Sequence, residues 1–203
     1  MSGEVQLIKE IKIEENEIGH GYESMLGGCF DETVTSIYIA EPWLLNSFQF
    51  DNFLQFTALV IKKSPNLKTF SVKTNPHAER LEIEVNQTEH QSNKKGQGCI
   101  RRRQNDVKRA TEIRKLKRNL RKLKQNFFQR KLLFNWQFDT DLHDRRIEVT
   151  CKDDECLILM GRGLDIYNKP EGKYSPGYFD LELRKCMKTS VQIFVGSDVF
   201  KNN

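Results

Sequence analysis

Residues 141–165 read DLHDRRIEVTCKDDECLILMGRGLD, a pattern that predicts a β-hairpin with a polar signature at each end. Residues 145–150 alternate apolar and charged side chains, as a strand with one buried face does. Residues 156–160 form a short apolar run bounded by turn-forming residues, which favours a buried return strand. We therefore expect the signatures at 143–145 (HDR) and 161–165 (GRGLD) to meet near one edge of a sheet.

The residue types of the two signatures are suited to binding an anion. An arginine side chain can offer two N–H donors to phosphate oxygens, and glycine lets backbone N–H groups approach them closely. His143, Arg145 and Arg162 are therefore candidate phosphate-binding residues. The alternative is that the two arginines only form ion pairs with nearby carboxylates. The carboxylates in question are Asp144, Asp165 and Asp180.

The formal net charge of the 203-residue chain is +5, but the charge is unevenly distributed. Residues 94–131 hold 16 Lys and Arg against two acids, so this segment is +14 and the remainder of the chain is −9. Between 101 and 129, apolar residues recur at steps of three and four, which predicts a helix with a narrow apolar stripe. The stripe is Ile113, Leu116, Leu120, Leu123 and Phe127. The residues expected to face outward are Arg114, Lys117, Arg118, Arg121, Lys122 and Lys124.

A helix of this kind is suited to lying on an anionic membrane, and equally to following nucleic-acid phosphates. Aromatic residues that would stack on bases are limited to Phe127 and Phe128 at its end, which favours lipid over single-stranded nucleic acid. Docking of the stripe on the sheet is compatible with membrane attraction, because the cationic face would remain outward. A coiled coil between two chains is the remaining alternative, and like charges on both helices oppose it.

The rest of the chain alternates strand and helix patterns, which predicts an α/β layered fold on a mixed sheet. Asn46 or Ser47 is expected to cap a helix that ends near Pro65, and residues 22–30 suggest a short helix. The other expected strands are 5–13 at an exposed edge, 34–39, 67–74 and 132–138 in the centre, and 81–85 and 190–195.

The composition indicates neither a metal site nor a cofactor. The five cysteines show no CxxC pair and no accompanying histidines, so neither zinc nor a disulfide framework is supported. No apolar run resembles a signal peptide or approaches the length of a membrane span, which predicts a protein of the cytoplasm or nucleus.

Several short motifs together resemble the C-terminal domain of the microtubule-interacting and trafficking (MIT) domain-containing protein family. The similarity covers roughly residues 7–194, interrupted at 76–129. The motifs are IKIEEN at 11–16, YES at 22–24, EPW at 41–43, HDR at 143–145, GRGLD at 161–165 and GYFDLELRKC at 177–186.

The resemblance implies a single phospholipase D-like domain over 1–203, with helices on both faces of a mixed sheet. Residues 76–129 would be an insertion atypical of the family, a mobile polar loop followed by an extra long basic helix. The implied function is non-catalytic binding of acidic phospholipids, including phosphoinositides, by a homodimer. Lys173 and Arg184 then join His143, Arg145 and Arg162 as phosphate-binding candidates.

The family acts with ESCRT-III in cytokinetic abscission, which places it at the midbody and late endosome membrane. In the family, an N-terminal MIT domain makes the ESCRT-III contact. No such helices precede the domain in this sequence, so direct ESCRT-III association stays open.

Phospholipase D chemistry uses the pattern HxK(x)4D, normally supplied twice. His143 and Arg145 preserve part of one copy, but Thr150 stands where the aspartate belongs. The other histidines, His20, His77 and His90, have no Lys or Arg two residues later, so we expect no enzyme. A symmetric dimer would bring two copies of His143 together, and a nucleic-acid-binding protein or dimeric phosphodiesterase therefore remains the alternative. In the purely structural alternative, Asp144 or Asp141 fixes His143.

Overall fold

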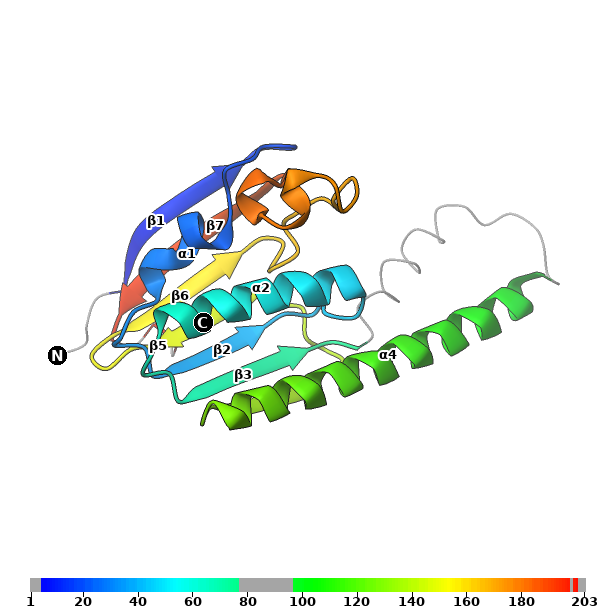
Figure 1. Cartoon of the computed structure of the whole chain (residues 1–203), viewed down its shortest axis with the longest axis horizontal. Helices are drawn as coiled ribbons and strands as arrows, with labels where there is room; N and C mark the ends of the chain where they lie inside the picture. The colour runs from blue at the N-terminus through cyan, green and yellow to red at the C-terminus, as the bar shows by residue number, and fades with distance from the viewer. Residues whose placement is uncertain (1–4, 77–96, 198, 201–203) are drawn as a thin grey trace.

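The computed structural model describes residues 5–76, 97–197 and 199–200, and its centre is a seven-stranded mixed sheet (Figure 1). The strand order is β1-β7-β6-β5-β2-β3-β4. Strands β2, β3 and β4 are parallel to one another, and all other neighbours are antiparallel. The strands are β1 Gln6–Ile13, β2 Ser36–Ala40, β3 Thr69–Thr74, β4 Leu133–Phe138, β5 Arg146–Thr150, β6 Glu155–Met160 and β7 Thr189–Gly196. The predicted α/β class, the mixed sheet and the β5–β6 hairpin are confirmed.

Three α-helices accompany the sheet in the described part of the chain: α1 Tyr22–Leu26, α2 Ser47–Lys63 and α4 Gln97–Gln129. Short 3₁₀ turns follow at η1 Gly27–Cys29, η2 Pro176–Tyr178 and η3 Leu181–Leu183. Helix α2 begins with a capping box, in which the Gln49 N–H donates to Asn46 Oδ1 at 2.9 Å and the Asn46 N–H donates to Gln49 Oε1 at 3.4 Å. The predicted cap is confirmed as Asn46.

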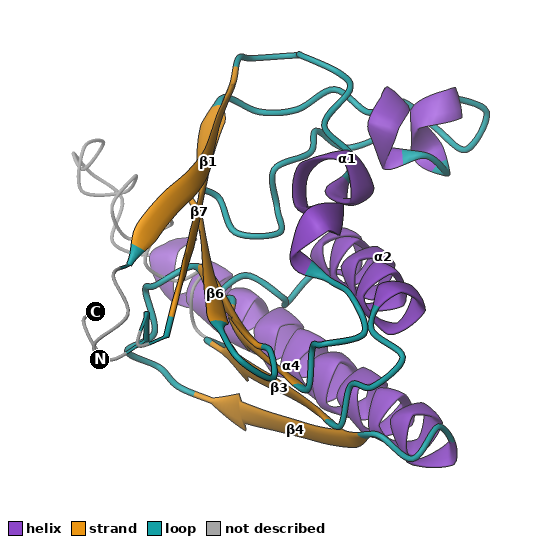
Figure 2. Cartoon of the chain, turned by 90° about the vertical axis from the view of Figure 1, so that its left-hand side faces the viewer, coloured by secondary structure: helices purple, strands orange, loops and turns teal. Residues whose placement is uncertain are grey.

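The described helices lie on one face of the sheet, as Figure 2 shows. On strand β3, the ring of Phe70 contacts Phe53 of α2 at a centroid distance of 6.2 Å and Phe127 of α4 at 5.4 Å. The expectation of helices on both faces is wrong for the described residues. The physical reason lies in the strands, whose opposite face carries half-exposed polar side chains such as Ser71 and Glu148. Such a face offers little apolar surface for a helix to bury.

Helix α4 docks on the sheet through its predicted stripe. Leu116, Leu120 and Phe127 are buried, and the rings of Phe127 and Phe134 of β4 lie 4.9 Å apart. The helix connects the parallel strands β3 and β4, which require a crossover between them. It starts before the predicted Arg101 and extends past the end of β3 (Figure 1). The alternative in which the stripe serves only a partner chain is therefore wrong.

One prediction about the sheet is wrong, and another concerns residues outside the described part of the chain. Strand β4 was predicted to be central but is an edge strand paired only with β3, and its Leu133 side chain is 55% exposed. Its alternating pattern shows one buried face and does not reveal how many neighbours the strand has. The predicted strand at 81–85 and the polar segment 86–96 lie outside the described residues.

Candidate functional site

A cleft of about 1000 Å³ opens at the end of the sheet where β6 ends and β5 and β7 begin. Arg145, Arg162 and Asp165 line it, so the two sequence signatures do converge. A smaller hollow of about 250 Å³ adjoins the cleft and is lined by His143 together with Arg145. The antiparallel β5–β6 pairing produces this arrangement, because it places the start of one strand beside the end of the other.

Arg145 lies between the two hollows. Its Nη1 donates to the Gly161 carbonyl oxygen at 2.8 Å, and its guanidinium carbon is 6.0 Å from the centre of the Trp43 ring. Its Nε is buried and has no hydrogen-bond partner among the described residues. The guanidinium is therefore held in place by the turn after β6 while retaining an unused donor.

Arg162 is exposed on the turn itself, where its Nε donates to the Lys188 carbonyl oxygen at 3.3 Å. Within the described ranges, neither Arg162 nor Arg145 forms an ion pair with a carboxylate, so the alternative reading of these arginines as ion-pair partners is wrong. Asp165 instead accepts from Gln49 Nε2 at 3.0 Å, and burial raises the pKa of the Asp165 carboxyl.

Two further cations of the cleft, Lys12 and Lys188, were not predicted. They come from β1 and from the residue before β7, which pair antiparallel with Lys12 opposite Ser190. No local motif marks either lysine, and only this long-range strand pairing could have identified them. Four cationic and two acidic side chains line the cleft, so its balance is positive. One of the four, Lys188, pairs with Glu14 at 2.8 Å, and both of these side chains are about 70% exposed.

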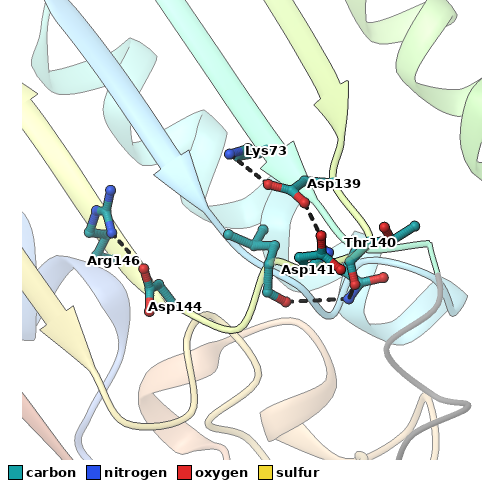
Figure 3. A network of polar contacts seen from close by, with 8 residues as sticks. Lys73, Asp139, Thr140, Asp141, Asp144 and Arg146 are labelled. Atoms are coloured by element: carbon teal, nitrogen blue, oxygen red, sulfur yellow. Dashed lines mark hydrogen bonds and ion pairs between the residues drawn. The ribbon is translucent and has the colours of Figure 1, made fainter.

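His143 is exposed on the loop between β4 and β5. Figure 3 shows other residues of this loop, among them Asp139, Asp141 and Asp144. Two of the acidic residues of this loop have other partners: Asp139 pairs with Lys73 at 2.7 Å and Asp144 with Arg146 at 2.8 Å. His143 makes no hydrogen bond within the described part of the chain, so its predicted fixation by Asp144 or Asp141 is wrong. Its ring faces the smaller hollow with Arg145 as its cationic neighbour.

The other two predicted phosphate-binding residues lie elsewhere. Arg184 is 5% exposed, and its guanidinium donates to the carbonyl oxygens of Gly177 at 2.5 Å and Tyr178 at 2.6 Å and to Asn52 Oδ1 at 3.3 Å. Burial lowers the pKa of Arg184. We therefore correct its assignment from ligand binding to holding the 177–184 segment. Lys173 lines neither hollow, and its Nζ lies 5.4 Å from the Tyr174 ring.

A buried carboxylate fixes the turn that carries Arg162. Glu41 is 1% exposed and accepts from the backbone N–H of Leu164 at 2.6 Å and of Trp43 at 3.0 Å. Tyr22 Oη donates to the Leu164 carbonyl oxygen at 2.6 Å, so both backbone groups of Leu164 are bound. Burial raises the pKa of Glu41 to about 7, and the two N–H donors and Arg145 oppose the rise.

The pattern for phosphodiester cleavage is incomplete around His143. Thr150, at the position of the expected aspartate, lies at the opposite end of β5 and pairs with Glu155 of β6. The nearest carboxylate to His20 is that of Glu17, with His20 Nε2 3.2 Å from Glu17 Oε1. In the described ranges, no group of three His, Cys, Asp or Glu side chains is arranged to hold a metal ion. No described helix has the length and apolarity to cross a bilayer.

Comparison with known proteins agrees with this fold. A family described as "Phospholipase D-like domain at C-terminus of MIT" matches residues 19–97 and 99–195, and the chain belongs to this family. Among individual proteins, it is similar to the mouse MIT domain-containing protein 1, with 31% identity over 186 residues. That similarity covers 92% of this chain and 61% of the mouse protein. The matched region includes nearly all of helix α4.

Proposed function

We propose that this domain is a peripheral membrane-binding module that recognises acidic phospholipids, including phosphoinositides, without hydrolysing them. The observation that carries the proposal is the two-sided character of helix α4. One face is buried in the core through Leu116, Leu120 and Phe127, so the opposite face is held outward. The cations of that outward face are Arg114, Lys115, Arg118, Arg121, Lys122 and Lys124, all exposed. The prediction that Lys117 faces outward is wrong, because Lys117 is half-buried with its Nζ 5.4 Å from the centre of the Phe138 ring, and Lys115 was not predicted.

These cations are available to an external anion. None of the six forms an ion pair within the described part of the chain, whereas Lys63, Lys73 and Arg146 do. A Lys or Arg close to an anionic bilayer gains about 1 kcal/mol, so a rigid row of them supports appreciable membrane affinity. Arg145 and Arg162 both line the cleft and are candidates to bind headgroup phosphates there, with His143 in the adjoining smaller hollow.

Kinship with the MIT domain-containing proteins supports the cellular setting of the proposal. We infer a cytoplasmic protein that acts as a homodimer at the midbody and late endosome membrane, in ESCRT-III-linked steps of cytokinetic abscission. The chain spans 61% of the length of the mouse relative, so this setting is proposed for the domain by kinship alone.

Vesicle sedimentation tests the membrane proposal. We expect the protein to pellet with phosphoinositide-containing vesicles at low salt and to be released as salt screens the charges. The triple variant Arg114→Gln, Arg118→Gln, Arg121→Gln should bind at least tenfold more weakly, because each charge contributes about 1 kcal/mol.

The matched control removes three positive charges from other exposed sites, with Lys62→Gln, Lys68→Gln and Lys152→Gln, and should bind nearly as well as the wild type. A third variant, Arg145→Gln with Arg162→Gln, reports the contribution of the cleft. Failure of the wild type to pellet at low salt would count against the proposal. So would an equal loss of binding in the helix triple and its control.

A phosphodiesterase or nucleic-acid-binding function is the second candidate, because exposed His143 lies beside Arg145 in the smaller hollow. Incubation with labelled DNA and RNA separates the two functions. We expect no cleavage, since the aspartate of the motif is replaced by Thr150. Cleavage that disappears in the His143→Ala variant would overturn the non-catalytic proposal.

A further inference from the structure

A cluster of exposed aromatic and aliphatic side chains lies on the segment between β6 and β7. Tyr174 is 92% exposed, Phe179 76%, Leu183 49% and Tyr178 41%. We call these four residues the aromatic turn. Single exposed apolar side chains are ordinary, but four large ones within ten residues suggest a contact surface. The rings of Tyr178 and Phe179 pack together with centroids 4.8 Å apart.

The backbone beneath the aromatic turn is firmly held. Arg184 donates to the carbonyl oxygens of Gly177 and Tyr178 from a buried position, and its guanidinium carbon lies 5.7 Å from the centre of the Phe48 ring. Gly177 is packed so closely that a Cβ there would meet the Leu183 carbonyl oxygen at 2.9 Å. The exposed side chains are therefore presented by an ordered scaffold, so little ordering would be required on binding.

The aromatic turn lies at the same end of the molecule as the cationic cleft. Arg184 links the turn to Asn52 and Phe48 of α2, and the first residues of that helix line the cleft through Asn46 and Gln49. Figure 1 shows the segment, coloured orange, at the end of the sheet where β6 ends and α2 begins. One flat surface can therefore meet both the cations and the aromatic side chains.

The chemistry of the aromatic turn matches a lipid interface. Tyrosine and phenylalanine at the headgroup level present an apolar ring to the acyl chains, and tyrosine keeps its hydroxyl in the polar layer. Lys173 lies beside the Tyr174 ring, and lysines in such positions extend their ammonium groups toward headgroup phosphates. An anionic bilayer satisfies both the rings and the charges next to them.

We propose that the aromatic turn inserts into the boundary between headgroups and acyl chains of an anionic bilayer while the cations of the cleft bind headgroup phosphates. This inference rests on the proposed membrane function and gives it a second, salt-insensitive component. Electrostatic attraction weakens as salt rises, whereas burial of apolar rings does not.

Depth-dependent quenching tests the insertion. In the Phe179→Trp variant, vesicles whose lipids carry bromine on the acyl chains should reduce the added fluorescence at least twofold. The Ile8→Trp variant is the matched control, because Ile8 is 55% exposed and lies near the start of β1, whereas the cleft residues Lys12 and Ile13 lie at the end of that strand. Its added fluorescence should change little. Wild-type protein with Trp43 and Trp136 supplies the background in both cases.

A second variant tests the energetic role. With Tyr174→Ser, Phe179→Ser and Leu183→Ser, the salt concentration that releases half of the protein should fall at least twofold, while pelleting at low salt persists. These side chains are exposed, so folding should be preserved, and circular dichroism verifies this. Pelleting without quenching at position 179, or with unchanged salt release, would overturn the insertion and leave the proposed function standing. Absence of wild-type pelleting at low salt would overturn both.

Discussion

Replacement of Gly163 by alanine is expected to lower the free energy of unfolding by about 3 kcal/mol or more. Gly163 has a φ of +61°, and a Cβ built there would clash with Glu41 Oε2. Alanine at positive φ costs about 1 kcal/mol. Displacement of Glu41 would also weaken its buried hydrogen bonds to Leu164 and Trp43, at about 1–3 kcal/mol each. Urea denaturation followed by circular dichroism measures the loss.

Gly19 provides the matched control for this prediction. It also has a positive φ, +88°, but a Cβ there would meet nothing within 4 Å. Gly19→Ala should therefore show only the backbone cost of about 1 kcal/mol. The difference between the two variants measures the contact with Glu41. Equal destabilisation by Gly163→Ala and Gly19→Ala would show that the buried carboxylate does not restrict the turn.

The local part of the fold was predictable because its signals lie close together in the sequence. The spacing of Ile113, Leu116 and Leu120 predicted both helix α4 and the face by which it docks. The alternation in 145–150 and the apolar run in 156–160 predicted the hairpin, and hence the convergence of Arg145 with Arg162. In each case one periodicity identified both the element and its buried side.

The arrangement of elements was harder to predict. Periodicity shows that β4 has an apolar side with Phe134 buried, but not that β3 is its only neighbour. It also gives the apolar side of each helix without stating which face of the sheet receives it. Phe70 is the residue that joins α2 and α4 on one face, and nothing in its own sequence context reveals this double contact.

The residues of the candidate site show the same difference between local patterns, which could be predicted, and long-range contacts, which could not. Arg145 and Arg162 flank one hairpin, so their proximity follows from a local pattern. Lys12 and Lys188 reach the cleft only because the first and last strands pair. Arg184 has the charge of a ligand residue, but its burial depends on tertiary contacts with Gly177 and neighbouring groups that sequence alone does not show.

The pH dependence of stability should contain a contribution from Glu41 of opposite sign to that of an ordinary ion-paired acid. Burial raises the pKa of Glu41 from 4.5 to about 7 in the folded state. Between these two values the unfolded chain has lost the proton while the folded chain still holds it. The contribution of Glu41 to stability is therefore fully present below about pH 4.5. It is lost as pH rises to about 7, and the total loss is about 3 kcal/mol.

Urea denaturation at intervals from pH 5 to pH 8, compared between the wild type and the Glu41→Gln variant, measures this contribution. The variant cannot ionise at position 41, so its stability should decline less over this range, whatever its absolute value. Acids with a lowered pKa, such as Asp139 beside Lys73, change stability in the opposite direction and below the window, because their folded pKa lies under 3.8. Parallel pH profiles of the two proteins would contradict the prediction. A steeper fall in the wild type would show that ionisation of Glu41, which anchors the turn carrying Arg162, opposes folding. The reason is that the hydrogen-bond donors around Glu41 only partly replace the water that its carboxylate loses on burial.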